Sequence, residues 1–247
     1  MISKLRSFLF VAPFFVLSTI VCGTVSMLVS LFDATGARQH RVARVWARSL
    51  LWAAGVHVEV SGVEKLTAAH GCVLASNHTS YMDTPVIIAS VPLQFRFFAK
   101  EPLFRIPFMG THLRRAGHLP VVLGDARAGV KSMNDGARLI RERELSVLVF
   151  PEGGRSENTL EPFREGAAYV AIRAGVPVYP VALTGVRDVL RMHTAIIRPG
   201  RVRIQIGDPI ETSHLKVRDR AALNRQLLHR IAEMAGEPVP LDSAPRS

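Results

Sequence analysis

Residues 7–32 form a run of 26 residues without a single Asp, Glu, Lys, Arg or His. A bilayer-spanning helix needs about 20 apolar residues, so this run is long enough to enter a membrane. A cleaved signal peptide is the alternative, but its apolar region has only about 7–15 residues and ends in a small-residue cleavage site. The run has no such site, and the bulky Ile20 and Val21 before Cys22 argue against lipoprotein-type cleavage. We therefore expect a membrane-associated segment.

Basic residues flank this run at both ends. Lys4 and Arg6 come before it, and four arginines spaced 3, 3 and 4 residues apart come after it. Such residues mark the cytoplasmic flanks of membrane segments. Because both flanks are basic and Pro13 and Gly23 interrupt the run, the pattern suits a helical hairpin or an in-plane segment at least as well as a single crossing. The four arginines are Arg38, Arg41, Arg44 and Arg48.

The spacing of these arginines places them along one face of a helix, with Val42, Trp46 and Leu50 on another. We expect this basic amphipathic helix to lie at the membrane surface, with Trp46 and Trp52 at the level of the lipid headgroups. The alternative is a helix that packs on the rest of the protein with its arginines in water. We assign residues 1–54 to an N-terminal, membrane-associated segment made of the apolar and the basic helix.

The composition favours a protein that acts at a membrane surface. Lys and Arg number 31 against 20 Asp and Glu, which gives a net charge of +11, while 48% of the residues are hydrophobic and the mean hydropathy is +0.21. Nucleic-acid binders are usually basic but hydrophilic, and disordered chains lack apolar residues, so a folded protein at an anionic membrane is favoured. Two cysteines, Cys22 and Cys72, exclude a disulfide-rich scaffold and a four-cysteine zinc site.

From residue 55 onward the sequence alternates between strand and helix patterns. Val56, Val58 and Val60 alternate with polar residues, as in a half-buried strand. Further strands are predicted at 72–75, 95–99, 119–122, 147–150, 178–183 and 202–206, with amphipathic helices at 126–140 and 223–234. This alternation predicts an α/β domain over residues 55–236, with a mixed, largely parallel sheet flanked by helices. The proline-containing residues 237–247 are predicted to be a flexible tail.

Polar residues follow the strand predicted at 72–75, and they read Ser-Asn-His-Thr-Ser-Tyr-Met-Asp over residues 76–83. In α/β folds the chemistry gathers in such loops. A histidine that removes a proton from an alcohol needs a carboxylate on its other ring nitrogen. Five residues apart on one helix, His78 and Asp83 would be separated by roughly 140°, so pairing requires His78 in the loop and Asp83 in the first turn of the next helix. A plain loop histidine and a helix-capping aspartate remain the alternative.

A second polar loop follows the strand predicted at 147–150 and reads Pro-Glu-Gly-Gly-Arg-Ser over residues 151–156. The glycine pair Gly153 and Gly154 lets the backbone approach an anion, while the guanidinium of Arg155 clamps it. This combination is typical of a phosphate monoester site. An ordinary turn with a solvated arginine is the alternative, and Lys100 and Arg105 at another strand-to-helix junction would add to the same positive field.

With both loops present in this order, the chain resembles the glycerolipid acyltransferase family typified by bacterial 1-acylglycerol-3-phosphate acyltransferases. The resemblance runs from about residue 55 to residue 209. Four blocks carry it: the His-x-x-x-x-Asp motif at 78–83, an acceptor-binding block at 100–121, Phe-Pro-Glu-Gly-Gly-Arg-Ser at 150–156, and Val-Pro-Val-Tyr-Pro-Val at 176–181. The first and third blocks together are highly specific.

The resemblance implies a glycerol-3-phosphate acyltransferase-like fold and direct acyl transfer to a lysolipid. His78, oriented by Asp83, would remove the proton of the 2-hydroxyl of 1-acylglycerol-3-phosphate (lysophosphatidic acid) as that hydroxyl attacks a thioester. The acyl donor would be acyl-CoA or acyl-acyl carrier protein, and the product phosphatidic acid. No cofactor and no metal are expected, since hydrogen-bond donors can polarise the carbonyl.

The resemblance also assigns the remaining site residues. Arg155, with Lys100 as the weaker candidate, would bind the acceptor phosphate, and Glu152, Gly153 and Gly154 would help to order the site. The expected location is the cytoplasmic face of the cell inner membrane, with an anionic membrane as partner. Nucleic acid is not an expected partner, because the chain carries no recognisable nucleic-acid motif.

Two departures from the family pattern leave the acceptor open. Gly154 stands where the family usually has Thr, and Val122, Leu123 and Gly124 occupy positions where many members carry an Arg. Another lysolipid, such as a lyso-ornithine lipid or a lysophospholipid, is the alternative acceptor. From a different class, the alternative is a catalytically idle module that binds membranes through its basic surface.

Overall fold

The computed structural model describes residues 2–66, 71–122 and 124–240. Its strands are β1 Val56–Ser61, β2 Val73–Ser76, β3 Phe95–Lys100, β4 Leu119–Val121, β5 Ser146–Val149, β6 Val178–Thr184 and β7 Gly200–Ile206. Its α-helices are α1 Ile2–Arg6, α2 Ala12–Val29, α3 Ala37–Ala54, α4 Asp83–Ser90, α5 Met109–Arg115, α6 Ala126–Arg143, α7 Gly166–Ala174, α8 Val186–Val189 and α9 Arg220–Ala235. Shorter helical turns are η1 Ser7–Val11, which is π-helical, and the 3-10 turns η2 Ser30–Phe32, η3 Val63–Leu66, η4 Glu101–Arg105 and η5 Val217–Asp219.

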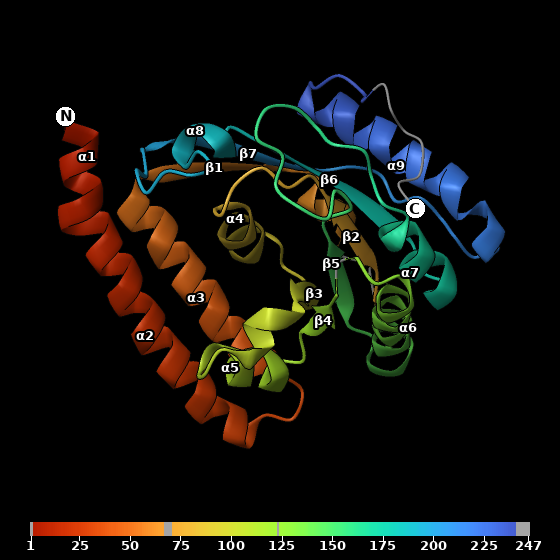
Figure 1. Ribbon diagram of the computed structural model, residues 1–247, viewed down its shortest axis with the longest axis horizontal. Helices are drawn as coiled ribbons and strands as arrows, with labels where there is room; N and C mark the ends of the chain where they lie inside the picture. The colour runs from red at the N-terminus through yellow and green to blue at the C-terminus, as the bar shows by residue number, and fades with distance from the viewer. Residues whose placement is uncertain (1, 67–70, 123, 241–247) are drawn as a thin grey trace.

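The seven strands form one sheet in the order β1-β7-β6-β2-β5-β3-β4 (Figure 1). Neighbours from β6 through β2, β5 and β3 to β4 pair in parallel, whereas β7 pairs antiparallel to β6 and parallel to β1. The predicted α/β fold with a mixed, largely parallel sheet is therefore confirmed. The central strand β2 is buried along its whole length, as expected when helices cover both faces.

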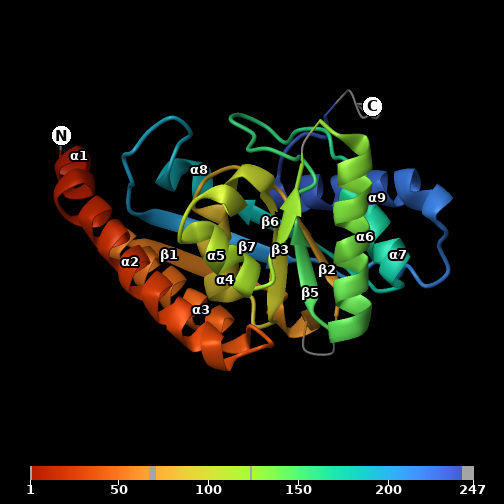
Figure 2. The same cartoon turned by 60° about the horizontal axis from the view of Figure 1, so that its bottom comes forward.

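Each face of the sheet carries its own apolar core. Along β2 the side chains alternate, so that Leu74 joins the cluster beneath α3 and α4, while Val73 and Ala75 join the cluster beneath α6, α7 and α9. Figure 2 shows α6 on the opposite side of the sheet from α3 and α4. The two cores fix β2 in the middle of the molecule, and with it the loop that follows β2.

The N-terminal helix turns most of its large apolar side chains outward and buries two of its serines. Ser7 is buried and exchanges two hydrogen bonds with the backbone of Ile197, from Oγ to the carbonyl at 2.9 Å and from the amide to Oγ at 3.0 Å. Ser26 is also buried and lies 3.1 Å from Nδ1 of His112. The exposed set consists of large apolar residues, among them Leu5, Phe8, Leu9, Val16, Leu17, Ile20, Val21, Val25, Leu28, Leu31 and Phe32.

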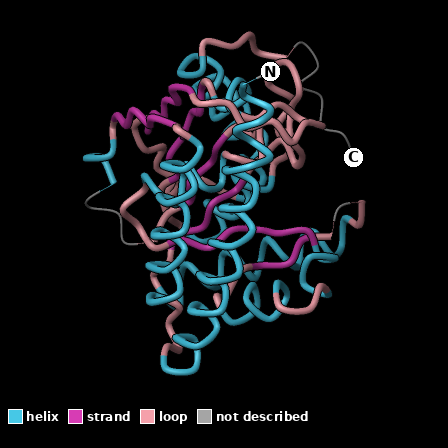
Figure 3. Tube along the Cα trace, turned by 90° about the vertical axis from the view of Figure 1, so that its left-hand side faces the viewer, coloured by secondary structure: helices cyan, strands magenta, loops and turns pink. Residues whose placement is uncertain are grey.

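This helix runs without a break. Residues Ser3–Phe32 form one continuous helix that contains an 18-residue window with a mean hydropathy of 2.2, so it is long and apolar enough by length and composition to cross a membrane. The interruption expected at Pro13 does not occur, because Pro13 stands in the first turn of α2, directly after the π-helical turn, where a missing N–H is tolerated. The hairpin is formed instead with α3, as Figures 1 and 3 show for α2 and α3.

One of the four arginines of α3 is bonded to the protein itself. Arg44 is half-buried, and its guanidinium donates to the carbonyl groups of Val91 at 2.8 Å and of Ile88 and Leu93 at 3.4 Å. These carbonyls lie at and just beyond the C-terminus of α4, where a cation satisfies unpaired acceptors and the helix dipole. Arg44 therefore ties the basic helix to the helix that carries Asp83.

The predicted flexible tail is wrong at its beginning. Glu237 accepts a hydrogen bond from Nη1 of Arg187 at 2.7 Å and another from the backbone amide of Leu160 at 2.6 Å. Val239 packs against the core beneath α9. The chain after α9 is thus held by an ion pair and an apolar contact. The amino-acid composition of this segment does not predict either contact. Residues 241–247 of the predicted tail lie outside the described residues.

Candidate active site

The candidate site lies where three neighbouring strands end. β2 pairs in parallel with β5 on one side and with β6 on the other, so their carboxyl ends meet at one edge of the sheet. Loops at such an edge are the usual place for function in an α/β fold. Residues 77–82 follow β2, residues 150–165 follow β5, and Gly185 follows β6. The two motif loops singled out in the sequence are therefore neighbours in space.

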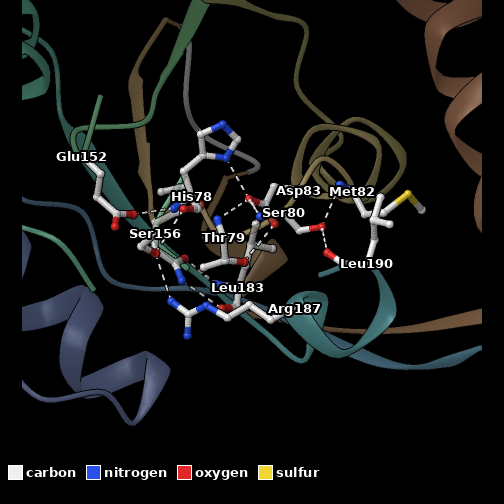
Figure 4. A network of polar contacts seen from close by, with 12 residues as sticks. His78, Thr79, Ser80, Met82, Asp83, Glu152, Ser156, Leu183, Arg187 and Leu190 are labelled. Atoms are coloured by element: carbon white, nitrogen blue, oxygen red, sulfur yellow. Dashed lines mark hydrogen bonds and ion pairs between the residues drawn. The ribbon is translucent and has the colours of Figure 1, made fainter. Parts of the chain in front are cut away.

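His78 and Asp83 form the pair that their spacing predicts. Nδ1 of His78 lies 2.7 Å from Oδ2 of Asp83, with His78 in the loop and Asp83 as the first residue of α4 (Figure 4). The carboxyl group is completely buried, whereas His78 is 9% exposed. Since a carboxylate accepts, the proton lies on Nδ1, and Nε2 presents a lone pair. Nε2 makes no hydrogen bond within the described ranges, so it is free to accept a proton.

Backbone amides hold the Asp83 carboxyl group in place. Oδ2 accepts hydrogen bonds from the N–H of Thr79 at 2.5 Å and of Ser80 at 2.8 Å, and Oδ1 accepts from the Thr79 hydroxyl at 3.2 Å. The loop thus wraps around the carboxyl group at the N-terminus of α4, where the helix dipole also favours negative charge. Ser80 is not placed as a nucleophile, because its buried hydroxyl donates to the carbonyl of Leu190 at 2.8 Å.

The second loop holds the backbone of His78 from both sides. Oε1 of Glu152 accepts the N–H of His78 at 2.6 Å, and the carbonyl of His78 accepts the N–H of Ser156 at 2.8 Å. The ring of Phe150 stacks on the imidazole with centroids 3.9 Å apart and planes 16° apart. The position of the imidazole is therefore set by residues of the 150–156 loop, which explains why the two motifs occur together.

The glycine pair of this loop has two different explanations. Gly153 has a φ of 74°, which favours glycine, whereas the nearest atom to a Cβ there is Nε of the flexible Arg164 side chain, at 2.8 Å. Gly154 has an ordinary φ and no atom within 4 Å of a Cβ position. A threonine side chain would therefore fit at position 154, so steric hindrance does not explain why this chain has glycine where the family usually has threonine.

The two predicted phosphate-binding cations are placed differently. Arg155 follows the glycine pair in the 150–156 loop, and burial lowers its guanidinium pKa, an effect opposed by Tyr81 and Asp83. Lys100 ends β3, two strands away from β2, and its side chain is exposed. In the described part of the chain, Lys100 shares no hydrogen bond or ion pair with the other predicted site residues. The structure thus joins Arg155, but not Lys100, to the His78 loop.

Two residues near the site were missed by sequence reasoning. Asn77 bonds twice to Leu183 of β6, donating at 2.9 Å and accepting at 2.8 Å, and so fixes the residue next to His78. Arg187, in α8 after β6, donates to the hydroxyl of Ser156 at 3.0 Å and to Glu237 at 2.7 Å. The only available signal for Arg187 was its place after a strand predicted to end at 183.

Glu152 carries a strongly perturbed carboxyl group. Burial raises its pKa to about 7, although hydrogen bonds from the amides of Glu161 and His78, a hydrogen bond with Ser156 and the charge of Arg187 all act in the opposite direction. Its two oxygens accept one backbone N–H each, from His78 at 2.6 Å and from Glu161 at 3.0 Å. Glu152 is therefore placed to order two loops at once.

We expect Glu152→Gln to flatten the dependence of the free energy of unfolding on pH. The carboxyl pKa is about 7 in the folded protein and near the ordinary 4.5 when unfolded. Between these values the folded state holds the extra proton, so wild-type stability falls as pH rises through this window. Relative to the variant, the change should be on the order of 1–3 kcal/mol between about pH 4 and pH 8, measured by urea unfolding. Glu157→Gln, at an exposed carboxylate, is the control, and an unchanged slope in Glu152→Gln would contradict this account.

The described residues contain no group of three or more His, Cys, Asp or Glu side chains that could hold a metal ion. The histidine and carboxyl group of the site instead bond to each other, so the arrangement suits proton transfer at Nε2 of His78. An oxygen bound next to Nε2 would become a nucleophile as its proton leaves.

Comparisons with known proteins identify relatives of this chain. The family described as Acyltransferase matches residues 57–184. A 1-acyl-sn-glycerol-3-phosphate acyltransferase of Limnanthes alba is 28% identical over 201 residues, 80% of this chain and 70% of that protein. The beta form of Homo sapiens is 30% identical over 82% of this chain and 75% of its own length, and the chloroplastic BAT2 of Brassica napus is 32% identical over 74% and 53%. The crystal structure of the LPA acyltransferase PlsC from Thermotoga maritima, 22% identical, shares the fold with a TM-score of 0.78 over 94% of this chain and 95% of that one.

Proposed function

Because this chain belongs to the acyltransferase family, we propose that it transfers a fatty acyl group to the 2-hydroxyl of 1-acylglycerol-3-phosphate and releases phosphatidic acid. The observation that carries the proposal is the buried His78–Asp83 pair, whose free Nε2 stands beside the loop with Arg155. The names of the relatives supply the acceptor, since those relatives are 1-acyl-sn-glycerol-3-phosphate acyltransferases.

The reaction needs one base and no covalent enzyme intermediate. Nε2 of His78 removes the hydroxyl proton of the acceptor as its oxygen attacks the thioester carbonyl of the donor. The tetrahedral intermediate then expels the thiolate, which takes the proton back from the imidazolium. Asp83 keeps the proton on Nδ1 and stabilises the imidazolium between the two steps. The donor is acyl-CoA or acyl-acyl carrier protein, both of which supply a thioester.

The protein acts at the cytoplasmic face of the cell inner membrane. A helix with its serines inward and its large apolar residues outward suits a lipid environment rather than water, since an exposed apolar surface of this extent marks a docking face. Basic residues of α3 such as Arg41 and Arg48 are exposed beside it and suit an anionic headgroup layer. The lysolipid acceptor resides in the same layer.

Arg155→Ala is expected to raise the KM for the acceptor about 10- to 100-fold while kcat changes little. A charged hydrogen bond to phosphate contributes about 1.5–3 kcal/mol, and its loss affects binding of the acceptor in the ground state and the transition state alike. The measurement is a set of initial rates against acceptor concentration at saturating donor. Arg173→Ala, at an exposed position of α7, is the matched control. An unchanged acceptor KM would remove Arg155 from the phosphate site.

The function itself is tested by offering the purified full-length protein labelled acyl-CoA or acyl-acyl carrier protein with a panel of lysolipids. Preferred transfer to 1-acylglycerol-3-phosphate supports the proposal, and the two donor arms decide the carrier. Preference for a lyso-ornithine lipid or a lysophospholipid without a phosphate monoester would overturn the acceptor. The feature that keeps this second candidate open is the absence of an Arg at Val122, Leu123 and Gly124, where many family members carry one. Absence of transfer to every acceptor would point to an idle membrane-binding module.

A further inference from the structure

The side chain of Arg155 rests on an aromatic ring. Its Cζ atom lies 4.0 Å from the ring centroid of Tyr81. Tyr81 belongs to the loop between His78 and Asp83, and 54% of it is exposed. The contact therefore joins the loop that carries the base to the loop that carries the phosphate-binding cation.

Arg155 has no other fixed partner. It makes no hydrogen bond and no ion pair with any residue that the structure describes, and its Nε is buried without an acceptor. Arg187, by contrast, is bonded to Glu237 and to Ser156, the residue after Arg155. The guanidinium of Arg155 is thus a cation next to the site whose N–H donors are all unused.

The kind of partner decides what the cation can do. A carboxylate partner would neutralise the charge of Arg155 and occupy the fork of donors that suits a phosphate group. An aromatic ring attracts the flat face of the guanidinium and leaves the donors at its edge free. Tyr81 therefore restrains the side chain of Arg155 without competing with an anion for it.

We propose that Tyr81 is a positioning residue for the acceptor phosphate, acting as a shelf that holds the Arg155 guanidinium ready to bind. This inference rests on the proposed function, in which Arg155 binds that phosphate. Since Tyr81 is three residues from His78 in one loop, the shelf and the base keep a fixed separation. A lysolipid carries its phosphate and its reacting hydroxyl on the same glycerol, so a fixed separation of cation and base suits such an acceptor.

The test is a double-mutant cycle in the full-length enzyme with 1-acylglycerol-3-phosphate as acceptor. Tyr81→Leu should raise the acceptor KM about two- to fivefold, as expected for loss of one cation–π contact at a partly exposed site, with kcat and the donor KM unchanged. Tyr81→Phe keeps the ring and should stay close to the wild type. Adding Tyr81→Leu to Arg155→Ala should raise the KM no further, because the shelf acts only through the arginine. Trp52→Leu, an exposed aromatic residue on α3, controls for loss of an aromatic at the membrane.

The outcomes separate the two proposals. An acceptor KM unchanged by Arg155→Ala contradicts the phosphate role of Arg155 in the proposed function. A raised KM in Arg155→Ala together with a wild-type KM in Tyr81→Leu overturns the shelf alone. Three other results would also overturn it. The first is an acceptor KM in the double variant that rises above that of Arg155→Ala, and the second is an acceptor KM in Tyr81→Phe raised as much as in Tyr81→Leu. The third is a change confined to kcat or to the donor KM. Thermal unfolding and vesicle binding, expected to match the wild type in the four variants at Tyr81 and Arg155, check that the fold is kept.

Discussion

Replacing His78 with alanine should lower kcat for acyl transfer by at least about a hundredfold, and in a routine assay abolish it, because a positioned general base contributes about 10²–10⁴-fold. Nε2 of His78 is the free ring nitrogen of the buried pair and the atom that accepts the hydroxyl proton. The fold should survive, since Asp83 keeps its donors from Thr79 and Ser80. The measurement is the single-turnover rate with labelled donor at saturating acceptor.

His229→Ala is the matched control for this variant, because His229 is exposed on α9. It should retain the wild-type rate. The His78→Ala protein should also unfold near the wild-type temperature and bind anionic vesicles as before. Wild-type turnover in His78→Ala would remove the proposed mechanism.

Asp83→Asn should lower kcat about a hundredfold or more while leaving the acceptor KM nearly unchanged. The N–H groups of Thr79 and Ser80 both point at Oδ2, so the oxygen of the new amide would take that position and still accept from Nδ1 of His78. The tautomer is then kept, and the rate falls because a completely buried negative charge no longer stabilises the imidazolium. Steady-state rates with both substrates varied measure the two parameters separately.

Asp83→Ala tests the same site by removing the hydrogen-bond acceptor as well as the charge. It removes the acceptor altogether and leaves the buried amides of Thr79 and Ser80 unpaired, at about 1–3 kcal/mol each. We expect Asp83→Ala to unfold at a clearly lower temperature than Asp83→Asn, with activity equally low. Substantial activity in Asp83→Asn would show that the charge of Asp83 is not needed.

Much of the fold was readable because it rests on local patterns. Each predicted strand corresponds to a strand of the sheet, since period-two alternation and short apolar runs report burial directly. The pairing of His78 with Asp83 was expected from the family resemblance, whereas the five-residue spacing alone left a loop histidine and a helix-capping aspartate as the alternative. The roles assigned to these and the other site residues stay predictions.

What the sequence did not reveal are contacts between distant positions. Arg44 binds carbonyl groups 44 to 49 residues away, and Glu237 pairs with Arg187 across 50 residues. In the sequence each reads as one more charged residue, of which the chain has many. The same applies to Ser7, whose partner Ile197 is 190 residues away. Only the folded chain decides which polar residues of an apolar helix face inward.

The inward serines of the N-terminal helix bear on how a water-soluble form of this protein should be made. Cutting the chain before α3 would strip the amide and carbonyl of Ile197 of the Ser7 hydroxyl and leave Nδ1 of His112 without Ser26. The helix is thus part of the domain's own hydrogen bonding as well as a candidate anchor. Replacing its outward leucines and phenylalanines with polar residues is a better route to solubility than truncation. Such replacements remove the exposed apolar surface and keep the hydrogen bonds between the helix and the rest of the protein.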